Sequence, residues 1–443
     1  MNRNGRDLIK KMPDGTEKHF NPFTGTEVWY IPGRGKRPIT THTPQSVAPL
    51  QKHNPEDYCD FCAANYFNTT PEKARLQQVN GEYQYREFLS PKEIFSSSAE
   101  FRRISNLFEI VRIDYWKQNY NYALSDKNRA RKENYLSSEL GRNHIISMVN
   151  LKMKYSGMSE SEISAISVDE KLDMSDAFFG GSHELIIPRR HYRDDATQTN
   201  HLASSGNLSQ EEHFQYFMFT IRSMMDMYEN IRYVRYVSIF QNWLREAGAS
   251  FDHLHTQLVG LDEWGVSVER ELERAAGNPN IYNEFAANFA SYNNLVICEN
   301  DHAIAFADIG HRNPTVAIYS KSERCRPNDH TPEELRGFSD LVHAIHAAMG
   351  PDISCNEEWY YMPPDSIVPM PWHVLIKWRV NISAGFEGGT KIYVNPLSVS
   401  QVRDMVVPKL FELRYAGVIK NLQIAQECPV KPNSLKYYKF NPD

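Results

Sequence analysis

The sequence has no long uninterrupted apolar run, and this absence excludes a membrane-spanning helix from the expected fold. The basic N-terminus, MNRNGRDLIKKMPDG, lacks the apolar stretch of a secretory signal peptide. Cysteine is also scarce, because only six of the 443 residues are cysteines, which favours a reducing compartment over a disulfide framework. We therefore expect a cytoplasmic protein that does not insert into membranes.

Neither sign of charge dominates the chain. Lys and Arg together number 49 and Asp and Glu number 55, so the net charge is −6. This acidic balance disfavours broad, non-specific binding to nucleic acids. Hydrophobic residues make up 41% and charged residues 23%, as is ordinary for a soluble globular protein. The length permits one to three domains with a sizeable core.

Two segments of the chain follow the same order of expected elements. Each has an apolar strand, a capped amphipathic helix and two further strands. Ser209 and Glu212 form the capping box of the first helix. Thr331 and Glu334 form that of the second, with Pro332 at its first position. A repeat this long predicts a duplicated domain and not a solenoid.

The join between the two copies is expected in residues 275–295, where Gly, Asn and Pro cluster. This predicts an N-terminal domain over 15–275 and a C-terminal domain over 290–443. A polar, Tyr- and Lys-rich stretch at about 111–172 interrupts the first domain. It predicts a helical excursion, a lid or a solvated surface insertion, and we favour the last of these.

The stretch GASFDHLHTQLVG, residues 248–260, carries the clearest chemical pattern. It is typical of a short strand, in which alternate side chains share one face. His253, His255 and Gln257 then point to one side, and apolar leucines point to the other. Such a face can bind a metal, hold a histidine nucleophile that attacks phosphorus, or bind phosphate through neutral donors.

The cysteines help to decide among these three kinds of site. Cys59 and Cys62 in DYCDFCAAN have a spacing common in zinc sites, although the spacing alone also fits two free thiols. Structural zinc usually has four ligands, and His191 and His253 would complete a closed Cys2His2 site. That arrangement would leave His255 for reaction.

These motifs follow an order that resembles the galactose-1-phosphate uridylyltransferase branch of the histidine-triad (HIT) superfamily, which includes ADP-glucose phosphorylase-like proteins. The matching segments are NPFTGTEVWYIPGRGKRPI, DYCDFCAAN, FRRISNLFEI, GSHELIIPRRH, FQNWLREAGASFDHLHTQ and WHVLIKWRVNISAGFEGGTKIYVNP. Each motif is weak or moderate alone, but their joint order is specific. The resemblance implies an α+β fold of duplicated HIT-like domains, each an antiparallel sheet packed with helices.

The resemblance also implies a nucleotidyltransferase mechanism. His255 would attack the α-phosphorus of a nucleotide-sugar or related nucleotide diphosphate. The resulting nucleotidyl-histidine would pass its nucleoside monophosphate to a sugar phosphate or phosphate. Gln257 and Ser250 would assist, and a backbone carbonyl would fix the tautomer of His255. The implied substrate-binding residues are Arg34, Arg37, Asn106, Asn242, Phe386 and Thr390. One structural zinc per chain and a homodimer are implied as well.

Two of the points at which the sequence departs from the family bear on the metal and the substrate. The His-x-His of the second repeat is reduced to Pro371-Trp372-His373, so we expect no conventional second metal site. Leu107 follows Asn106 where the galactose enzyme has an acidic residue, so uridine specificity does not carry over. Three other functions stay open: a HIT-type nucleotide hydrolase, a nucleotide-binding protein without turnover, and a hydrolase that uses the zinc as a Lewis acid.

Overall fold

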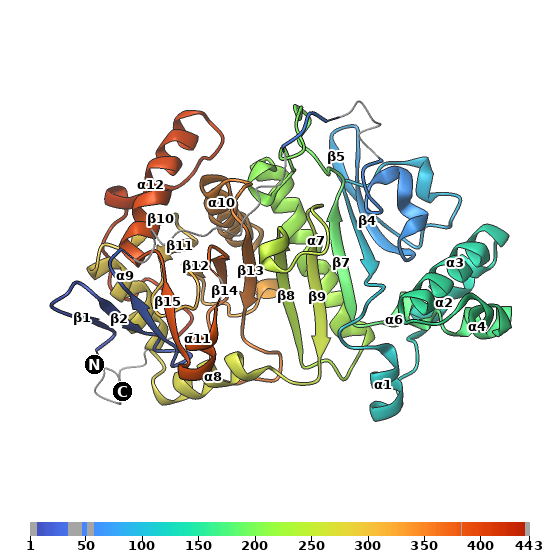
Figure 1. Ribbon diagram of the computed structural model, residues 1–443, viewed down its shortest axis with the longest axis horizontal. Coiled ribbons are helices and arrows are strands. Elements are labelled where there is room, and N and C mark those ends of the chain that lie inside the picture. Colours follow the sequence, from blue (N-terminus) through green and yellow to red (C-terminus); the bar gives the residue numbers. More distant parts are fainter. Residues whose placement is uncertain (1–6, 34–46, 51–56, 382, 439–443) are drawn as a thin grey trace.

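The computed structural model describes residues 7–33, 47–50, 57–381 and 383–438. Most strands form one antiparallel sheet of twelve (Figure 1). In spatial order these strands are β16 (Gln423–Ile424), β10 (Val296–Glu299), β11 (Ala303–Ala307), β12 (Thr315–Ser320), β14 (His373–Trp378), β13 (Cys355–Tyr360), β8 (Tyr236–Trp243), β9 (Thr256–Leu261), β7 (His183–Pro188), β6 (Phe101–Ser105), β4 (Glu72–Val79) and β5 (Glu82–Glu87).

A smaller sheet ties the N-terminal segment to the second half of the chain. Its strands are β1 (Ile9–Lys11), β2 (Glu17–Phe20), β3 (Glu27–Tyr30) and β15 (Ile392–Asn395), and β15 runs parallel to β3. The Asn21 amide donates to the Ile309 carbonyl over 3.0 Å. At Gly310, where φ is +69°, an added Cβ would lie 2.4 Å from the Asn21 nitrogen. Glycine is therefore required where these two segments meet.

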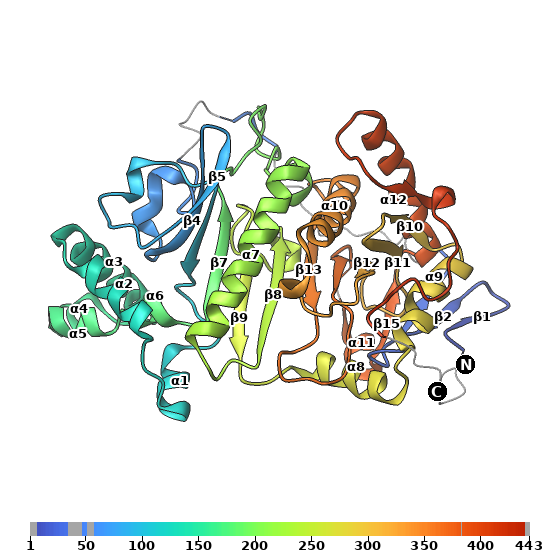
Figure 2. The ribbon, with the colours of Figure 1, turned by 180° about the vertical axis from the view of Figure 1, so that it is seen from behind.

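Three long helices cover one face of the large sheet (Figure 2). They are α7 (Gln210–Asn230), α10 (Pro332–Met349) and α12 (Val399–Tyr415). Both predicted capping boxes are confirmed, at Ser209 for α7 and at Thr331 for α10. The shorter helices α8 (Val266–Gly277), α9 (Asn288–Tyr292) and α11 (Gly385–Thr390) lie elsewhere. No helix in the described ranges has the length and apolar character needed to cross a membrane.

The large sheet repeats one arrangement as a mirrored pair. The first half has the spatial order β6-β7-β9-β8, and the second has β11-β12-β14-β13. The halves meet at the antiparallel pair β8–β13, where Phe240 lies opposite Glu358. In each half a long helix follows β7 or β12, as the repeated pattern in the sequence predicts. The segment around 275–295 is mostly helical, because α8, a π-helical turn at Asn283–Ala287 and α9 occupy it.

The stretch that interrupts the first half is helical. Its helices are α1 (Ile113–Tyr120), α2 (Asp126–Leu136), α3 (Glu139–Tyr155), α4 (Glu160–Ala165), α5 (Val168–Asp173) and α6 (Asp176–Gly180). Figures 1 and 2 place them at the end of the sheet that holds β4. Trp116, Tyr135 and Ile145 are buried and join the main core. The insertion therefore packs against the main core, and the expectation of a solvated surface insertion was wrong.

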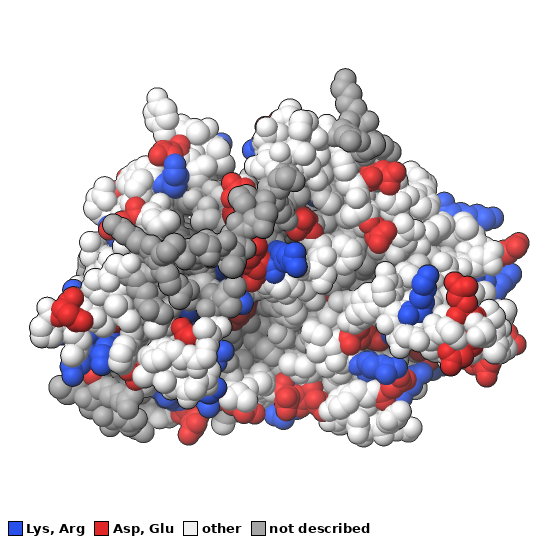
Figure 3. Space-filling model, in the orientation of Figure 1, with Lys and Arg blue, Asp and Glu red and all other residues white. Residues whose placement is uncertain are grey.

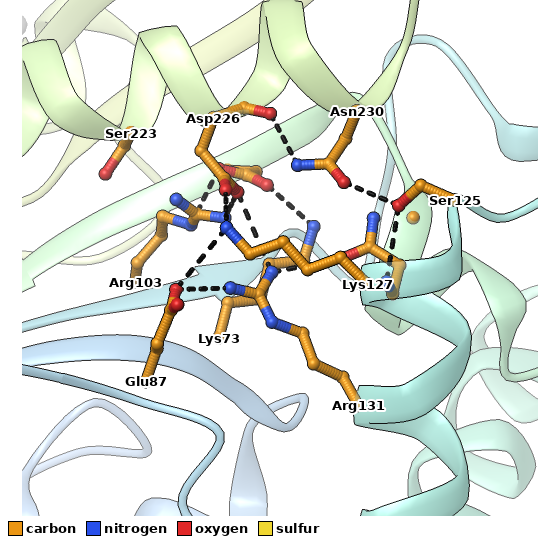
Figure 4. Close-up of polar contacts among 12 residues, drawn as sticks. Lys73, Glu87, Arg103, Ser125, Lys127, Arg131, Ser223, Asp226 and Asn230 are labelled. Atoms are coloured by element: carbon orange, nitrogen blue, oxygen red, sulfur yellow. Dashed lines mark hydrogen bonds and ion pairs between the residues drawn. The ribbon is translucent and has the colours of Figure 1, made fainter.

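A buried network of charges docks this insertion onto the sheet and α7 (Figure 4). On the sheet, Lys73 Nζ and Arg103 Nε lie 2.6 and 3.1 Å from the Glu184 carboxylate. Arg103 also contacts Asp226 of α7. From α2, Lys127 Nζ lies 2.6 Å from Asp226 Oδ1. Asp226 is thus the carboxylate shared between the insertion and the sheet.

Asp226→Asn should lower the free energy of unfolding at pH 7 by about 3 kcal/mol, because it leaves buried cations without their partner. Burial alone would raise the pKa of Asp226, but the Arg103 charge and the Lys127 hydrogen bond hold it below 3.8. A lowered carboxyl pKa adds stability that is present above about pH 4 and is lost as pH falls through the folded value. The difference from wild type should therefore be smaller at pH 3, as measured by urea denaturation.

Asp114→Asn is the matched control, because Asp114 pairs with Arg112 on the surface of the same insertion. An exposed pair contributes about 1 kcal/mol or less. Equal losses in the two variants would contradict a docking role for Asp226.

Candidate active site and metal centre

Four side chains converge beside the sheet face that α7 and α10 leave open. The ligand atoms of Cys59, Cys62, His191 and His253 all lie within 4.8 Å of one another. The two sulfurs are 3.8 Å apart, and the Nδ1 atoms of His191 and His253 lie 3.3 and 3.5 Å from Cys59 Sγ. A tetrahedral ion with bonds of about 2.3 Å to sulfur and 2.0 Å to nitrogen separates such atoms by roughly 3.5–3.8 Å. The geometry therefore fits a four-coordinate metal ion.

The surroundings orient these ligands. His253 Nε2–H donates to the Pro188 carbonyl over 2.7 Å, which leaves Nδ1 as the atom facing the sulfurs. The hydrogen bond that the Cys59 thiol donates to Cys62 Sγ lowers the pKa of Cys62. A small apolar cluster lies beneath Cys59 and is formed by Phe61, Ile104, Leu185 and Ile187. These contacts hold the ligands in place and favour the Cys62 thiolate, the form that a metal needs.

The sequence predicts a strand that includes His253 and His255. In the structure both residues lie just before strand β9. Strand β9 begins at Thr256, and the His253 carbonyl before it accepts from His255 Nδ1 over 2.8 Å. The alternation is nonetheless kept, since Leu254 is buried in the core and the Thr256 hydroxyl meets Tyr216 of α7. Both histidines thus lie on the side away from α7.

The hydrogen bond to the His253 carbonyl fixes the tautomer of His255. With the proton on Nδ1, the Nε2 atom carries a lone pair. Burial lowers the pKa of His255, and the residue is 4% exposed. The Phe61 ring lies edge-on to the imidazole, with ring centroids 5.6 Å apart. His255 is therefore a neutral imidazole whose Nε2 can act as a nucleophile.

Another histidine, His183, completes the site and was missed by the sequence analysis. The Ile110 N–H donates to His183 Nδ1 over 3.0 Å, so Nε2 carries the proton. That proton is donated to Gln257 Oε1 over 3.0 Å. The amide NH2 of Gln257 is then left to donate to a phosphate oxygen. Asn106 lies next to this pair, with its Nδ2 3.1 Å from His183 Nε2.

Two predicted residues flank this centre. Asn242 lies on β8 and its Oδ1 accepts from Asn356 over 2.7 Å, so its own amide hydrogens face outward as donors. Ser250 is exposed in the turn before His253. Gly248 starts this turn with a φ of +91°, which glycine adopts without strain.

The remaining predicted residues lie farther away or outside the described ranges. Phe386 and Thr390 are exposed on α11, which packs against β15 in the second half. Arg34 and Arg37 fall outside the described residues.

An apolar loop borders the site next to Asn106. Phe108 and Ile110 are 54% and 65% exposed, which is unusual for side chains of this size beside a polar centre. Helix α3 of the insertion braces the loop, because Lys152 Nζ lies 2.8 Å from Glu109 and Tyr155 meets the edge of Phe108. The loop offers a flat apolar surface beside His183.

Comparisons with known proteins agree with this architecture. The chain matches one protein-family model, Domain of unknown function (DUF4921), over residues 12–437. The crystal structure of an ADP-glucose phosphorylase from Arabidopsis thaliana with bound ADP-glucose matches with a TM-score of 0.56 and 16% identity, over 88% of this chain and 98% of that chain. A GalT-like protein from the same plant matches with a TM-score of 0.55 and 15% identity, over 88% and 98%. No curated protein matches in sequence.

At these identities the likeness is one of fold. It confirms the predicted α+β architecture of two GalT-like halves, each an antiparallel sheet packed with helices.

Cys59→Ser should remove the bound metal and lower the melting temperature, because metal binding is coupled to folding. Elemental analysis of the purified chain should find about one metal ion per wild-type chain and close to none in the variant. Cys428→Ser is the control, since Cys428 is also half-buried but lies outside the cluster. A metal-free wild type, or equal metal content in all three proteins, would refute the assignment.

Proposed function

This chain belongs to the family of the domain of unknown function DUF4921, and from its site we propose that it is a nucleotidyltransferase. Its substrate would be a nucleotide-sugar or related nucleotide diphosphate, and its acceptor a sugar phosphate or phosphate. One observation carries the proposal: His255 is a neutral imidazole with a fixed tautomer, beside a Gln257 amide that is itself fixed as a donor. The shared fold with an ADP-glucose phosphorylase supports the same reaction class.

In the first step, the Nε2 lone pair of His255 attacks the α-phosphorus. A nitrogen–phosphorus bond forms, and the bond from phosphorus to the bridging oxygen breaks. Sugar phosphate leaves with that electron pair. The imidazole gains positive charge, which the His253 carbonyl stabilises through the Nδ1 hydrogen bond. No general base is needed, because the attacking nitrogen carries no proton.

In the second step, a phosphate oxygen of the acceptor attacks the same phosphorus atom. The nitrogen–phosphorus bond breaks, and the pair of electrons returns to Nε2. The Gln257 amide and the Ser250 hydroxyl are suited to donate to the phosphate oxygens in both steps. Arg34 and Arg37 are proposed to add charge through their guanidinium groups.

The apolar loop is proposed as the nucleobase side of the pocket. Phe108 and Ile110 supply exposed surface next to Asn106, whose amide can reach a ribose hydroxyl. This assignment places the phosphate end at His255 and the base toward the insertion. Helix α3 contacts this loop, so it would influence indirectly which nucleobase is bound.

Zinc is the metal we propose for the Cys59, Cys62, His191 and His253 cluster, because two thiolates and two imidazoles in tetrahedral spacing suit it. Four protein ligands leave no position for substrate, so its role would be structural. The four residues hold the segment before β9 against the end of β7. The His253 backbone, which orients His255, is fixed by the same contacts.

The central prediction is a covalent adduct on His255. Intact-protein mass spectrometry after brief incubation with UDP-glucose, ADP-glucose, GDP-mannose or a dinucleoside polyphosphate should give a mass gain of one nucleoside monophosphate. His255→Asn should form none, because it lacks the nucleophilic nitrogen. The donor that reacts identifies the base.

His302→Asn is the matched control, since His302 is half-buried at the start of β11 and far along the sheet from β9. Turnover that needs no added sugar phosphate or phosphate would identify a hydrolase. Turnover retained by His255→Asn would overturn the covalent mechanism, and absence of both adduct and turnover would overturn the transferase.

A further inference from the structure

A second cavity, of about 360 Å³, opens in the other half of the molecule on the same side of the sheet. Figure 3 shows this side of the molecule in space-filling form. The floor of the cavity is formed by β12, β13 and β14, and its walls by α8, the β11–β12 turn and residues 21–26. A volume of this size is in the range of small-molecule sites, roughly 300–1,000 Å³. Nothing in the proposed reaction uses this cavity.

The cavity lies where the mirrored sheet repeats the first site. Gln257 lies opposite Phe240, and Leu375 lies opposite Glu358, with Phe240 and Glu358 paired at the centre. His255 comes two residues before Gln257, and His373 comes two residues before Leu375. His373 therefore occupies the position in the second half that His255 occupies in the first. The correspondence extends to a hydrogen bond, because His373 Nδ1 donates to the Pro371 carbonyl over 2.9 Å.

His373 differs from His255 in its surroundings. It is 1% exposed and stacked between two tyrosine rings, with centroids 4.4 Å from Tyr319 and 5.2 Å from Tyr360. Its Nε2 faces the buried Glu271 carboxyl at 3.7 Å. Both faces of the imidazole are covered, so His373 is part of a rigid floor and not a nucleophile.

Arginines gather at the mouth of this cavity. Arg270 of α8, Arg312 of the β11–β12 turn and Arg379 after β14 all line it and are exposed. Across the described part of the chain, none of the three forms an ion pair with a carboxylate. Arg379 donates to the Asn356 side chain over 2.9 Å. Arginines that converge without acidic partners are suited to bind an anion.

The acidic side chains of the cavity do not cancel this charge. Asp308 is paired with His311 at 2.7 Å, and Glu358 with Lys377 at 2.6 Å. Burial raises the pKa of Glu271 to about 8, so this carboxyl is mostly protonated at pH 7. The cavity is therefore positive in a chain whose net charge is −6.

The geometry points to a second ligand site, and we propose that this cavity binds a phosphate ester of a sugar or nucleoside. The arginines at the mouth would hold the phosphate group. The Thr24 and Thr26 hydroxyls on the wall would meet the ring hydroxyls. The proposal does not rest on catalysis at His255, because it concerns binding without reaction.

Isothermal titration calorimetry tests the proposal on the full metal-loaded chain carrying His255→Asn, which removes turnover. Glucose 1-phosphate and AMP represent the two sources of the ester, and inorganic phosphate is the probe for the anion alone. At least one ester should bind more tightly than inorganic phosphate. Arg312→Ala with Arg379→Ala should weaken that binding at least tenfold, because two guanidinium contacts to the phosphate are lost.

Arg129→Ala with Arg324→Ala is the control, since it removes the same charge from exposed sites elsewhere. Hydrogen exchange should show protection by the ester in residues 308–313 and 373–379. Equal weakening in the two double variants, no binding of either ester, or protection confined to residues 253–260 would overturn the proposal. Binding of inorganic phosphate as tight as that of both esters would overturn the sugar or nucleoside part.

Discussion

The hydrogen bond from the His255 imidazole to the His253 carbonyl couples the two chemical parts of this protein. The side chain of His253 faces Cys59 and Cys62, while its backbone oxygen sets the tautomer of His255. A change that displaces Cys59 or Cys62 would therefore also displace His255, the proposed nucleophile. The proposed attack needs no separate base, because one backbone oxygen orients the ring and would offset the charge that develops on it.

The mirrored sheet contains the hydrogen bond from a histidine to a backbone carbonyl twice, once in each half. His373 has the same carbonyl hydrogen bond as His255, but two tyrosine rings cover its faces and Pro371 takes the place of the ligand His253. The second half therefore has the same backbone hydrogen bond, but Pro371 supplies no imidazole and the ring faces of His373 are covered. A duplicated fold can then offer two chemically different sites on one sheet, one proposed for covalent chemistry and one proposed to hold an anion.

Much of this was predictable from the sequence, and the failures have physical causes. Capping boxes and strand alternation are local, so α7, α10 and the two faces around His255 followed from the pattern. His183 was missed because its role depends on a cross-strand contact to Gln257 and on one backbone N–H of Ile110. The insertion was misjudged because its polar composition hid buried side chains such as Arg131, whose charge is balanced by distant carboxylates. The second cavity brings together arginines far apart in the chain, which no local motif could indicate.

The central claim is that Nε2 of His255, and not another atom, bonds to phosphorus. The most direct measurement is nitrogen-15 and phosphorus-31 NMR of the trapped adduct made with ring-labelled histidine. The account predicts a one-bond nitrogen–phosphorus coupling to Nε2, with Nδ1 still protonated and hydrogen-bonded to the His253 carbonyl. Coupling to Nδ1, or phosphorus bonded to a different residue, would contradict it.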